Sequence, residues 1–350
     1  MRRVVRAAAD AAFAQQSTKA VCERREMMSL RVPHVPSPMA ERSPPQSPEY
    51  AVDVRALRRH RDRAAAGFRT SAVLADEVAS RMFERLEMVR LPAGEVLDFG
   101  CADGVWTERL RARYPDRHVF GLDPALQLCR AAVAAGEGGT RWWQRWTRPS
   151  TRVVCADLDA LPFRRETLAL VWSNLAVHWL ARPERTWREL GALLRPGGLL
   201  TFSTFGPDTL REIRQIWRDL PGEPPLLPLA DMHNVGDALV QAGFTAPVMD
   251  MEMITLTYPD FAAFVADLRG QGATDVRPGR PRGLASPRAW ARLAERFESR
   301  RVDGRTAVSF EIVQGHAWWP EGGARKTADG RDIVRIHGLG TRGAGRAGRG

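Results

Sequence analysis

Short apolar runs that end in glycine or a polar residue alternate with helical stretches along most of this chain, and this alternation constrains the fold more than any other feature. The first run, residues 95–100, follows a stretch in which apolar residues recur at helical spacing. Helical stretches such as 184–194 and 231–242 fall between most of the later runs, which are 118–123, 152–156, 168–173, 199–205, 248–258 and 307–318. Strands that alternate with helices predict an α/β fold, with a mostly parallel sheet covered by helices on both faces.

The last two runs are expected to depart from the parallel pattern. Both are long, and no helix follows the final one. We therefore expect them to pair antiparallel at one edge of the sheet. The sequence predicts a seven-stranded, mostly parallel sheet with an antiparallel edge strand.

Composition excludes several classes of protein. The chain has 350 residues, of which 44% are hydrophobic and 27% charged, as in soluble globular proteins. It contains no apolar run long enough for a membrane span, so no membrane partner is expected. The four cysteines show neither metal-ligand spacing nor a disulfide pattern, so no metal is predicted and a reducing cytoplasm fits best.

The two ends of the chain differ from its centre. Residues 1–49 are rich in Arg, Ala, Ser and Pro and carry +3 of the net charge of +11, whereas residues 321–350 are rich in Gly and Arg and carry +4. We predict a disordered basic extension and a disordered tail around one domain, 50–320. A targeting peptide and a start codon placed too far upstream both remain open for the extension. Nucleic acid is not expected as a partner, because its binding needs a clustered basic patch on a folded surface.

The first strand ends in a loop that suits a cationic ligand. Asp98 precedes the loop, in which Gly100, Ala102 and Gly104 alternate with other residues before a helix begins. This G-x-A-x-G spacing differs from the dinucleotide fingerprint G-x-G-x-x-G. A carboxylate at this position repels a pyrophosphate and attracts an ammonium group. The ligand is therefore expected to be a nucleoside that carries a cationic amino-acid group.

Acidic residues also end the next two strands. Asp123, followed by Pro124, is placed to accept the hydroxyl groups of a ribose. Asp157 could accept a hydrogen bond from an adenine amine while Leu158 packs on the ring. Each acid alone is equally well explained as a helix N-cap. Three acids at successive strand ends, which meet at one edge of a parallel sheet, favour a ligand site.

These residues resemble the class I S-adenosylmethionine-dependent methyltransferases, through Asp123 and the segments 96–104, 156–163 and 194–198. The resemblance implies a Rossmann-like fold with S-adenosylmethionine as cofactor, and it adds Asn174 to the cofactor-binding residues. One departure is Ala102, because glycine is usual there and alanine narrows the room beneath the methionine group. A second is Phe68, where tyrosine is common.

Three later segments, 171–179, 202–210 and 268–274, resemble the malonyl-acyl-carrier-protein O-methyltransferases of biotin synthesis, and this likeness covers about residues 52–320. It implies that the methyl acceptor is the free carboxylate of a malonyl thioester on acyl-carrier protein or coenzyme A. Three alternatives stay open: a peptide-arginine hydroxylase of the complex I assembly type, a small-molecule or quinone-precursor methyltransferase, and a binding module without activity.

The implied acceptor sets what the site must do. Its carboxyl group has a pKa of about 3 to 4 and is ionised at neutral pH, so methyl transfer needs positioning and exclusion of water but no base. Arg269 is the predicted clamp for this carboxylate, because a guanidinium binds a carboxylate through two hydrogen bonds, although a solvated arginine at a helix end explains it as well. His178 is predicted to form a wall or donate a hydrogen bond, with a catalytic base and a packed histidine as the alternatives. Trp179 is predicted to line the substrate pocket.

A basic stripe follows the fifth strand. Arg211, Arg214 and Arg218 fall on one arc of the expected helix. Such a stripe suits an acidic carrier protein, although a solvated helix face explains it as well. We expect a lid from about 206–230 and 260–305. The sequence does not indicate the oligomeric state.

Overall fold

Seven strands pair into a single sheet, which confirms the predicted class. The computed structural model describes residues 52–137, 152–218, 226–280 and 286–321, all within one compact unit. The predicted 1–49 extension and almost all of the predicted 321–350 tail lie outside the described residues. The strands are β1 (Glu95–Phe99), β2 (Val119–Asp123), β3 (Arg152–Cys155), β4 (Leu168–Ser173), β5 (Leu194–Phe205), β6 (Thr245–Tyr258) and β7 (Thr306–Trp318).

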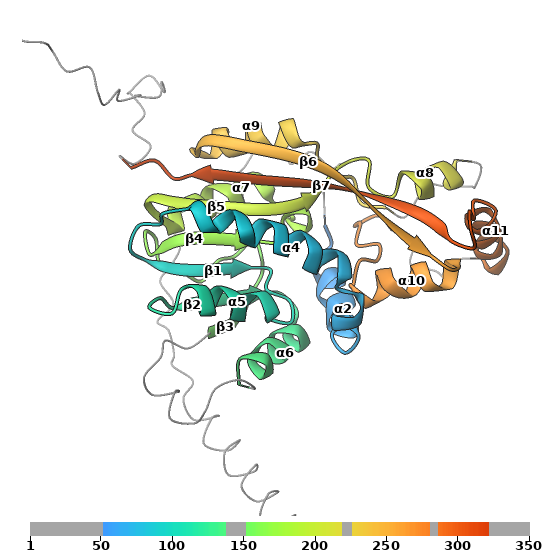
Figure 1. The fold of residues 1–350 in the computed structure, drawn as a ribbon, viewed down its shortest axis with the longest axis horizontal. Coiled ribbons are helices and arrows are strands. Elements are labelled where there is room, and N and C mark those ends of the chain that lie inside the picture. Colours follow the sequence, from blue (N-terminus) through green and yellow to red (C-terminus); the bar gives the residue numbers. More distant parts are fainter. Residues whose placement is uncertain (1–51, 138–151, 219–225, 281–285, 322–350) are drawn as a thin grey trace, which may run out of the picture. The chain divides into compact units, whose positions relative to one another are not determined.

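The strand order is β3-β2-β1-β4-β5-β7-β6 (Figure 1). Pairs among the first five strands are parallel, whereas β7 runs antiparallel to both of its neighbours, β5 and β6. The order reverses at β1, because β2 lies on one side of it and β4 on the other. In open sheets of this kind ligands bind beyond the carboxyl ends of the strands at the reversal.

Helices cover both faces of the sheet, as the alternation predicts. On one face Leu97 and Val171 pack in a core with α7 and α9, and on the other Val96 and Leu170 pack in a second core with α4 and α5. The helices are α2 (Val54–Ala64), α3 (Phe68–Ser71), α4 (Val73–Arg85), α5 (Val105–Arg113), α6 (Leu126–Glu137), α7 (Pro183–Leu193), α8 (Arg211–Trp217), α9 (Met232–Ala242), α10 (Phe261–Gly270) and α11 (Pro287–Glu298), with short 3-10 helices η2 (Leu86–Met88) and η4 (Val177–Trp179).

The chain before and after β6 places helices near the carboxyl ends of the parallel strands. β6 and β7 continue past the parallel strands toward α10 and α11 (Figure 1). α8 packs on β7 and α11, and α10 packs on α2 and α3. Of these helices, α8, α10 and α11 fall in the two ranges expected for the lid. No helix in the described ranges is long and apolar enough to cross a membrane.

Candidate active site

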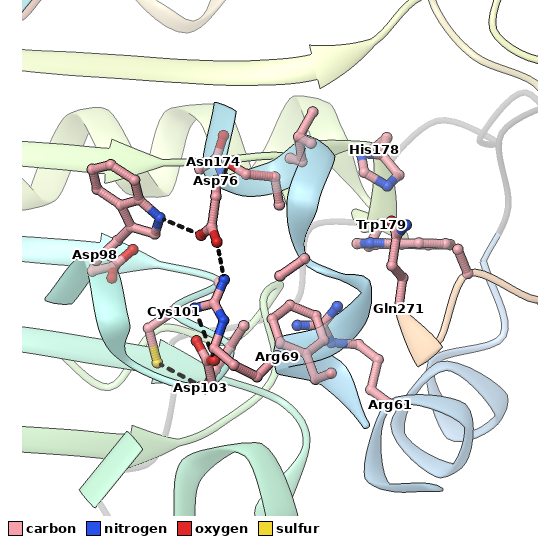
Figure 2. Close-up of a pocket in the computed structure, with 18 of the residues that line it drawn as sticks. Arg61, Arg69, Asp76, Asp98, Cys101, Asp103, Asn174, His178, Trp179 and Gln271 are labelled. Atoms are coloured by element: carbon pink, nitrogen blue, oxygen red, sulfur yellow. Dashed lines mark hydrogen bonds and ion pairs between the residues drawn. The ribbon is translucent and has the colours of Figure 1, made fainter. Parts of the chain in front are cut away.

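A pocket opens beyond β1 and β4, at the reversal of the strand order. It holds about 720 Å³ of empty space, its open mouth included, which is within the usual range for small-molecule sites, about 300 to 1,000 Å³. Asp98, Gly100, Ala102 and Asn174 line it together with His178, and we call it the strand-end pocket (Figure 2). With Trp179, which also lines it, the structure brings six of the predicted residues to one cavity.

Asp98 is the carboxylate of this pocket that has no cationic partner within the described chain. It is 2% exposed, and its Oδ2 accepts a hydrogen bond of 2.6 Å from the Thr107 hydroxyl. Burial raises the pKa of Asp98 to about 7, the Thr107 hydrogen bond opposes this rise, and the charges of Asp123 and Asp103 add to it. A nearby cation would stabilise the ionised form of this buried carboxyl group. This agrees with the cationic ligand predicted for this strand end.

The loop after β1 needs glycine for its own packing. Gly100 has φ of 84°, and a Cβ there would lie 2.2 Å from the Cβ of Ala176. Gly104 has φ of 78°, and a Cβ there would lie 2.6 Å from the Cβ of Ala132. Between them Ala102 adopts φ of 48°, a left-handed conformation that costs a non-glycine residue about 1 kcal/mol. Ala102 also lines the pocket, so its methyl group occupies room that glycine would leave open.

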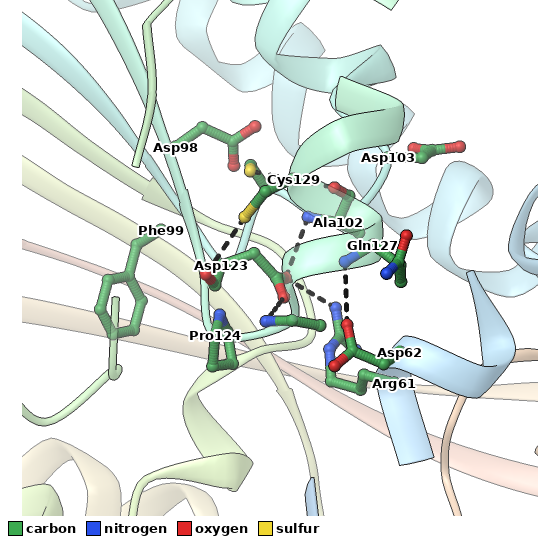
Figure 3. A network of polar contacts seen from close by, with 12 residues as sticks. Arg61, Asp62, Asp98, Phe99, Ala102, Asp103, Asp123, Pro124, Gln127 and Cys129 are labelled. Atoms are coloured by element: carbon green, nitrogen blue, oxygen red, sulfur yellow. Dashed lines mark hydrogen bonds and ion pairs between the residues drawn. The ribbon is translucent and has the colours of Figure 1, made fainter. Parts of the chain in front are cut away.

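Asp123, the predicted ribose acceptor, is already fully partnered (Figure 3). Its side chain is 0% exposed, and its Oδ2 lies 2.8 Å from Nη2 of Arg61. The backbone N–H groups of Ala102 and Ala125 donate to the same carboxylate, over 3.2 and 2.9 Å. Asp123 does not line the strand-end pocket, whereas Arg61 does.

The residues predicted to hold the adenine are also not in the pocket. Asp157 forms an ion pair with Arg58, and Leu158 is 4% exposed in the hydrophobic core. Pro124 likewise does not line the pocket. Two arginines of α2, Arg58 and Arg61, therefore hold the acid that ends β2 and the acid that follows β3.

The donor set fits the cationic amino-acid end of S-adenosylmethionine. Asp98 supplies a buried carboxylate that lacks a cation, and the loop through Ala102 lies beside it. Asp123 and Asp157, the acids predicted for the nucleoside end, form ion pairs with arginines of α2. The positions of these two carboxylates are therefore coupled to the position of α2.

Sequence reasoning missed the arginines of α2 and α3. Arg58 and Arg61 are three residues apart, so they share a helix face, and this spacing was the available signal. Arg69 bridges Asp76 and Asp103, with 3.1 Å between its Nη1 and Oδ2 of Asp103 (Figure 2). These contacts tie the N-terminal helices to the loop after β1.

His178 stands between the strand-end pocket and a second cavity. Its ring centroid lies 4.4 Å from that of Trp179 and 4.9 Å from that of Phe205. Burial, with a smaller effect from the charge of Arg61, lowers the pKa of His178 to about 3. Its Nδ1 is buried and has no hydrogen-bond partner in the described part of the chain. His178 is therefore neutral at physiological pH.

Asn174 joins the end of β4 to its surroundings. Its Nδ2 donates to the carbonyl oxygen of Ala75 in α4 over 2.8 Å, and its Oδ1 accepts from the Ser203 hydroxyl over 2.8 Å. Asn174 lines the strand-end pocket while it holds α4 against the sheet.

The second cavity, which we call the lid pocket, shares His178, Trp179, Phe205, Gln271 and Ala273 with the first. It holds about 630 Å³ and is bounded by η4, the end of β5, α8, residues 226–229 and residues 273–276. Its walls are mainly apolar. Two adjoining cavities with a common wall suit a reaction between two bound molecules.

The predicted arginines separate into different environments. Arg214 lines the lid pocket and is half-buried. Arg211, which contacts Glu212 at the start of α8, and Arg218, the residue that follows α8, are exposed. Arg269, the predicted clamp, is exposed near the end of α10 and lines neither pocket. Of the predicted cations, the structure brings Arg214 to the cavities and leaves Arg269 outside them.

Comparison with known proteins decides the family. The methyltransferase domain family matches residues 97–202. The malonyl-[acyl-carrier protein] O-methyltransferase of Gallionella capsiferriformans is 42% identical over 82% of this chain and 97% of its own length. Those of Laribacter hongkongensis and Halorhodospira halophila are 42% and 40% identical, over 82% and 83% of this chain and 97% and 96% of their own. The chain belongs to the malonyl-[acyl-carrier protein] O-methyltransferase family.

Membership in this family confirms the predicted enzyme class. The chain is an O-methyltransferase that uses S-adenosylmethionine. The hydroxylase alternative is not favoured, because these relatives are methyltransferases. The roles of individual site residues stay predictions.

Proposed function

We propose that this protein methylates the free carboxylate of a malonyl thioester on acyl-carrier protein, a step of biotin synthesis. The pair of adjoining pockets carries the proposal, together with the names of the relatives that match this chain over most of its length. The strand-end pocket offers a carboxylate to a cationic ligand. The lid pocket offers a mainly apolar cavity on the other side of His178 and Trp179.

Bound S-adenosylmethionine would supply a methyl group activated on a positively charged sulfur. Asp98 would hold its ammonium group, and the common wall of the two pockets would face its methyl. The acceptor carboxylate is ionised at neutral pH, so His178 need not remove a proton. His178 would instead form a neutral wall beside the reacting groups. Its pKa of about 3 suits this role, because the ring carries no charge at neutral pH.

The walls between the pockets would exclude water. Trp179 and Phe205 flank His178, and a dry setting favours a reaction in which an anion and a cation become neutral. We propose that the segments about 206–230 and 260–305 act as the lid of the domain 50–320. The free Cys101 and Cys129 agree with action in a reducing cytoplasm.

Direct assay tests the proposal. The full chain is incubated with methyl-labelled S-adenosylmethionine and malonyl-acyl-carrier protein, and the methyl ester is measured by mass spectrometry. Acetyl-acyl-carrier protein is the matched control, because it lacks the free carboxylate. We expect an ester only with the malonyl form. Absence of the ester, while a known enzyme of the family yields it under the same conditions, would refute the proposal.

A further inference from the structure

The charges that line the lid pocket are few within the described residues. Its two ionised side chains are Arg214 and Asp275, since His178 is neutral. Asp275 is paired with Arg277, with 2.9 Å between Oδ2 and Nη2, and accepts the Arg277 N–H over 3.0 Å. The guanidinium of Arg214 makes neither a hydrogen bond nor an ion pair in the described ranges.

The surroundings of Arg214 leave its charged guanidinium available to bind an anion. Burial lowers its pKa and Asp208 raises it, but the two side chains form no ion pair among the described residues. A guanidinium keeps its charge at neutral pH in proteins, because its ordinary pKa exceeds about 12. The remaining walls beside it, such as Leu226, Leu268 and Phe310, are apolar and offer the guanidinium no hydrogen bonds.

The other arginines that line the two pockets are already paired with carboxylates. In the strand-end pocket Arg61 is paired with Asp123, and Arg69 with Asp76 and Asp103. Of the guanidinium groups on the two pockets in the described chain, Arg214 is the one without a carboxylate.

We infer that Arg214 binds the free carboxylate of the malonyl thioester and thereby selects dicarboxylic acyl groups; the inference rests on the proposed function. The five residues shared by the two pockets carry no positive charge, so an acceptor anion at this wall needs its counter-charge from the lid pocket. Arg214 supplies that charge from α8. Its planar fork can bind both oxygens of a carboxylate.

This role also explains how the product would leave. Methylation converts the carboxylate into a neutral ester, and the pair with Arg214 is lost. The ester therefore binds less tightly than the substrate. An acetyl thioester, which lacks the charge, gains nothing from Arg214.

The test compares two malonyl substrates in variants of the full chain. Malonyl-pantetheine has the acyl group but neither the phosphate nor the carrier protein. We expect Arg214→Met to lower kcat/KM about 100-fold with both malonyl-pantetheine and malonyl-acyl-carrier protein, as for other buried charge pairs that lose one partner. Arg214→Lys should recover part of this loss. Arg188→Met, on the exposed face of α7, should leave both values unchanged.

Binding of S-adenosylhomocysteine, measured by calorimetry, serves as the check on folding and should be the same in Arg214→Met and the wild type. A loss confined to malonyl-acyl-carrier protein would assign Arg214 to the phosphate or the carrier and overturn the inference. So would an unchanged Arg214→Met, or an equal loss in Arg269→Met. If the wild type itself methylates neither malonyl substrate, the proposed function fails and the inference with it.

Discussion

At the scale of single residues, the role proposed for the buried Asp98 would make cofactor binding depend on pH. Its pKa of about 7 lies above the ordinary aspartate value of 3.8, because burial disfavours the charged form. The folded chain then holds a proton that the unfolded chain releases, so the contribution of Asp98 to the free energy of unfolding falls as pH rises from about 4 to 7. The same proton must leave before Asp98 can pair with an ammonium group.

We therefore expect the affinity for S-adenosylmethionine to weaken at acid pH. The amino group of the cofactor stays protonated below about pH 7.7, so the protonation of Asp98 sets the pH dependence of binding. Kd should rise about tenfold per pH unit below 7. Calorimetric titrations at pH 5.5, 6.2 and 7.0 measure this. Asp98→Asn should bind weakly with little pH dependence. A wild-type Kd that is constant over this range would contradict the role of Asp98.

His178 gives a second prediction at the residue scale. Since its pKa of about 3 leaves it neutral and the acceptor is already ionised, His178→Gln should keep kcat within about tenfold of the wild type. Loss of a general base would lower kcat by about 100-fold to 10,000-fold. Rates of methyl transfer at pH 7.5 decide between the two. The exposed His233→Gln is the matched control.

Single residues could be predicted where the signal is local and not where it depends on the tertiary fold. Asp98 and Ala102 follow directly from a strand and its loop, and both line the pocket. Arg269 was predicted as the carboxylate clamp and Arg214 as part of a basic stripe, yet packing places Arg214 on the lid pocket and leaves Arg269 exposed. Asp123 was recognised as an acid at a strand end, but nothing local indicated its partner 62 residues earlier.

At the scale of secondary-structure elements, α2 is held by two ion pairs that differ in burial. Arg61 and Asp123 form a buried pair, with side chains 9% and 0% exposed, whereas Arg58 and Asp157 form a pair 42% and 36% exposed. Removing one partner of a buried pair leaves an uncompensated charge and costs about 3 to 5 kcal/mol. Exposed pairs contribute about 1 kcal/mol or less.

Arg61→Met should therefore lower the free energy of unfolding by about 3 kcal/mol, the low end of that range, because two backbone N–H groups still serve Asp123. Arg58→Met, the matched control, should cost less than about 1 kcal/mol. Urea unfolding measures both. Adding Asp123→Asn to Arg61→Met should restore part of the loss. Equal effects of the two single variants would show that burial does not distinguish these pairs.

The elements themselves were predictable because their signals are local, but some of their boundaries were not. The fifth strand was expected at 199–205, yet β5 begins at Leu194 and includes Pro196 and Gly197. The backbone at Leu194 pairs with Leu168 of β4, and Gly197 donates its N–H to the carbonyl oxygen of Trp319. Such partners lie far away in sequence and give no local signal. The local Pro-Gly-Gly pattern predicts a turn, so the first residues of the strand were missed.

At the scale of the whole molecule, the charge distribution decides how an acidic carrier would approach. Of the net charge of +11, +7 belongs to residues 1–49 and 321–350, so residues 50–320 carry only +4. A small net charge steers a partner weakly, and local clusters then matter more. Arg211 and Arg218 are exposed at the two ends of α8, the helix that places Arg214 on the lid pocket.

Arg211→Glu with Arg218→Glu should therefore raise KM for malonyl-acyl-carrier protein about tenfold or more and leave malonyl-pantetheine unaffected, because exposed charges at an interface act mainly on encounter. The wild-type KM for the carrier should rise with salt, since the Debye length shortens from about 10 Å at 0.1 M to 3 Å at 1 M. The matched control is Arg185→Glu with Arg188→Glu, both exposed on α7, which changes the net charge by the same amount as the first double variant. If both double variants raise KM equally, net charge attracts the carrier and α8 is not its docking site.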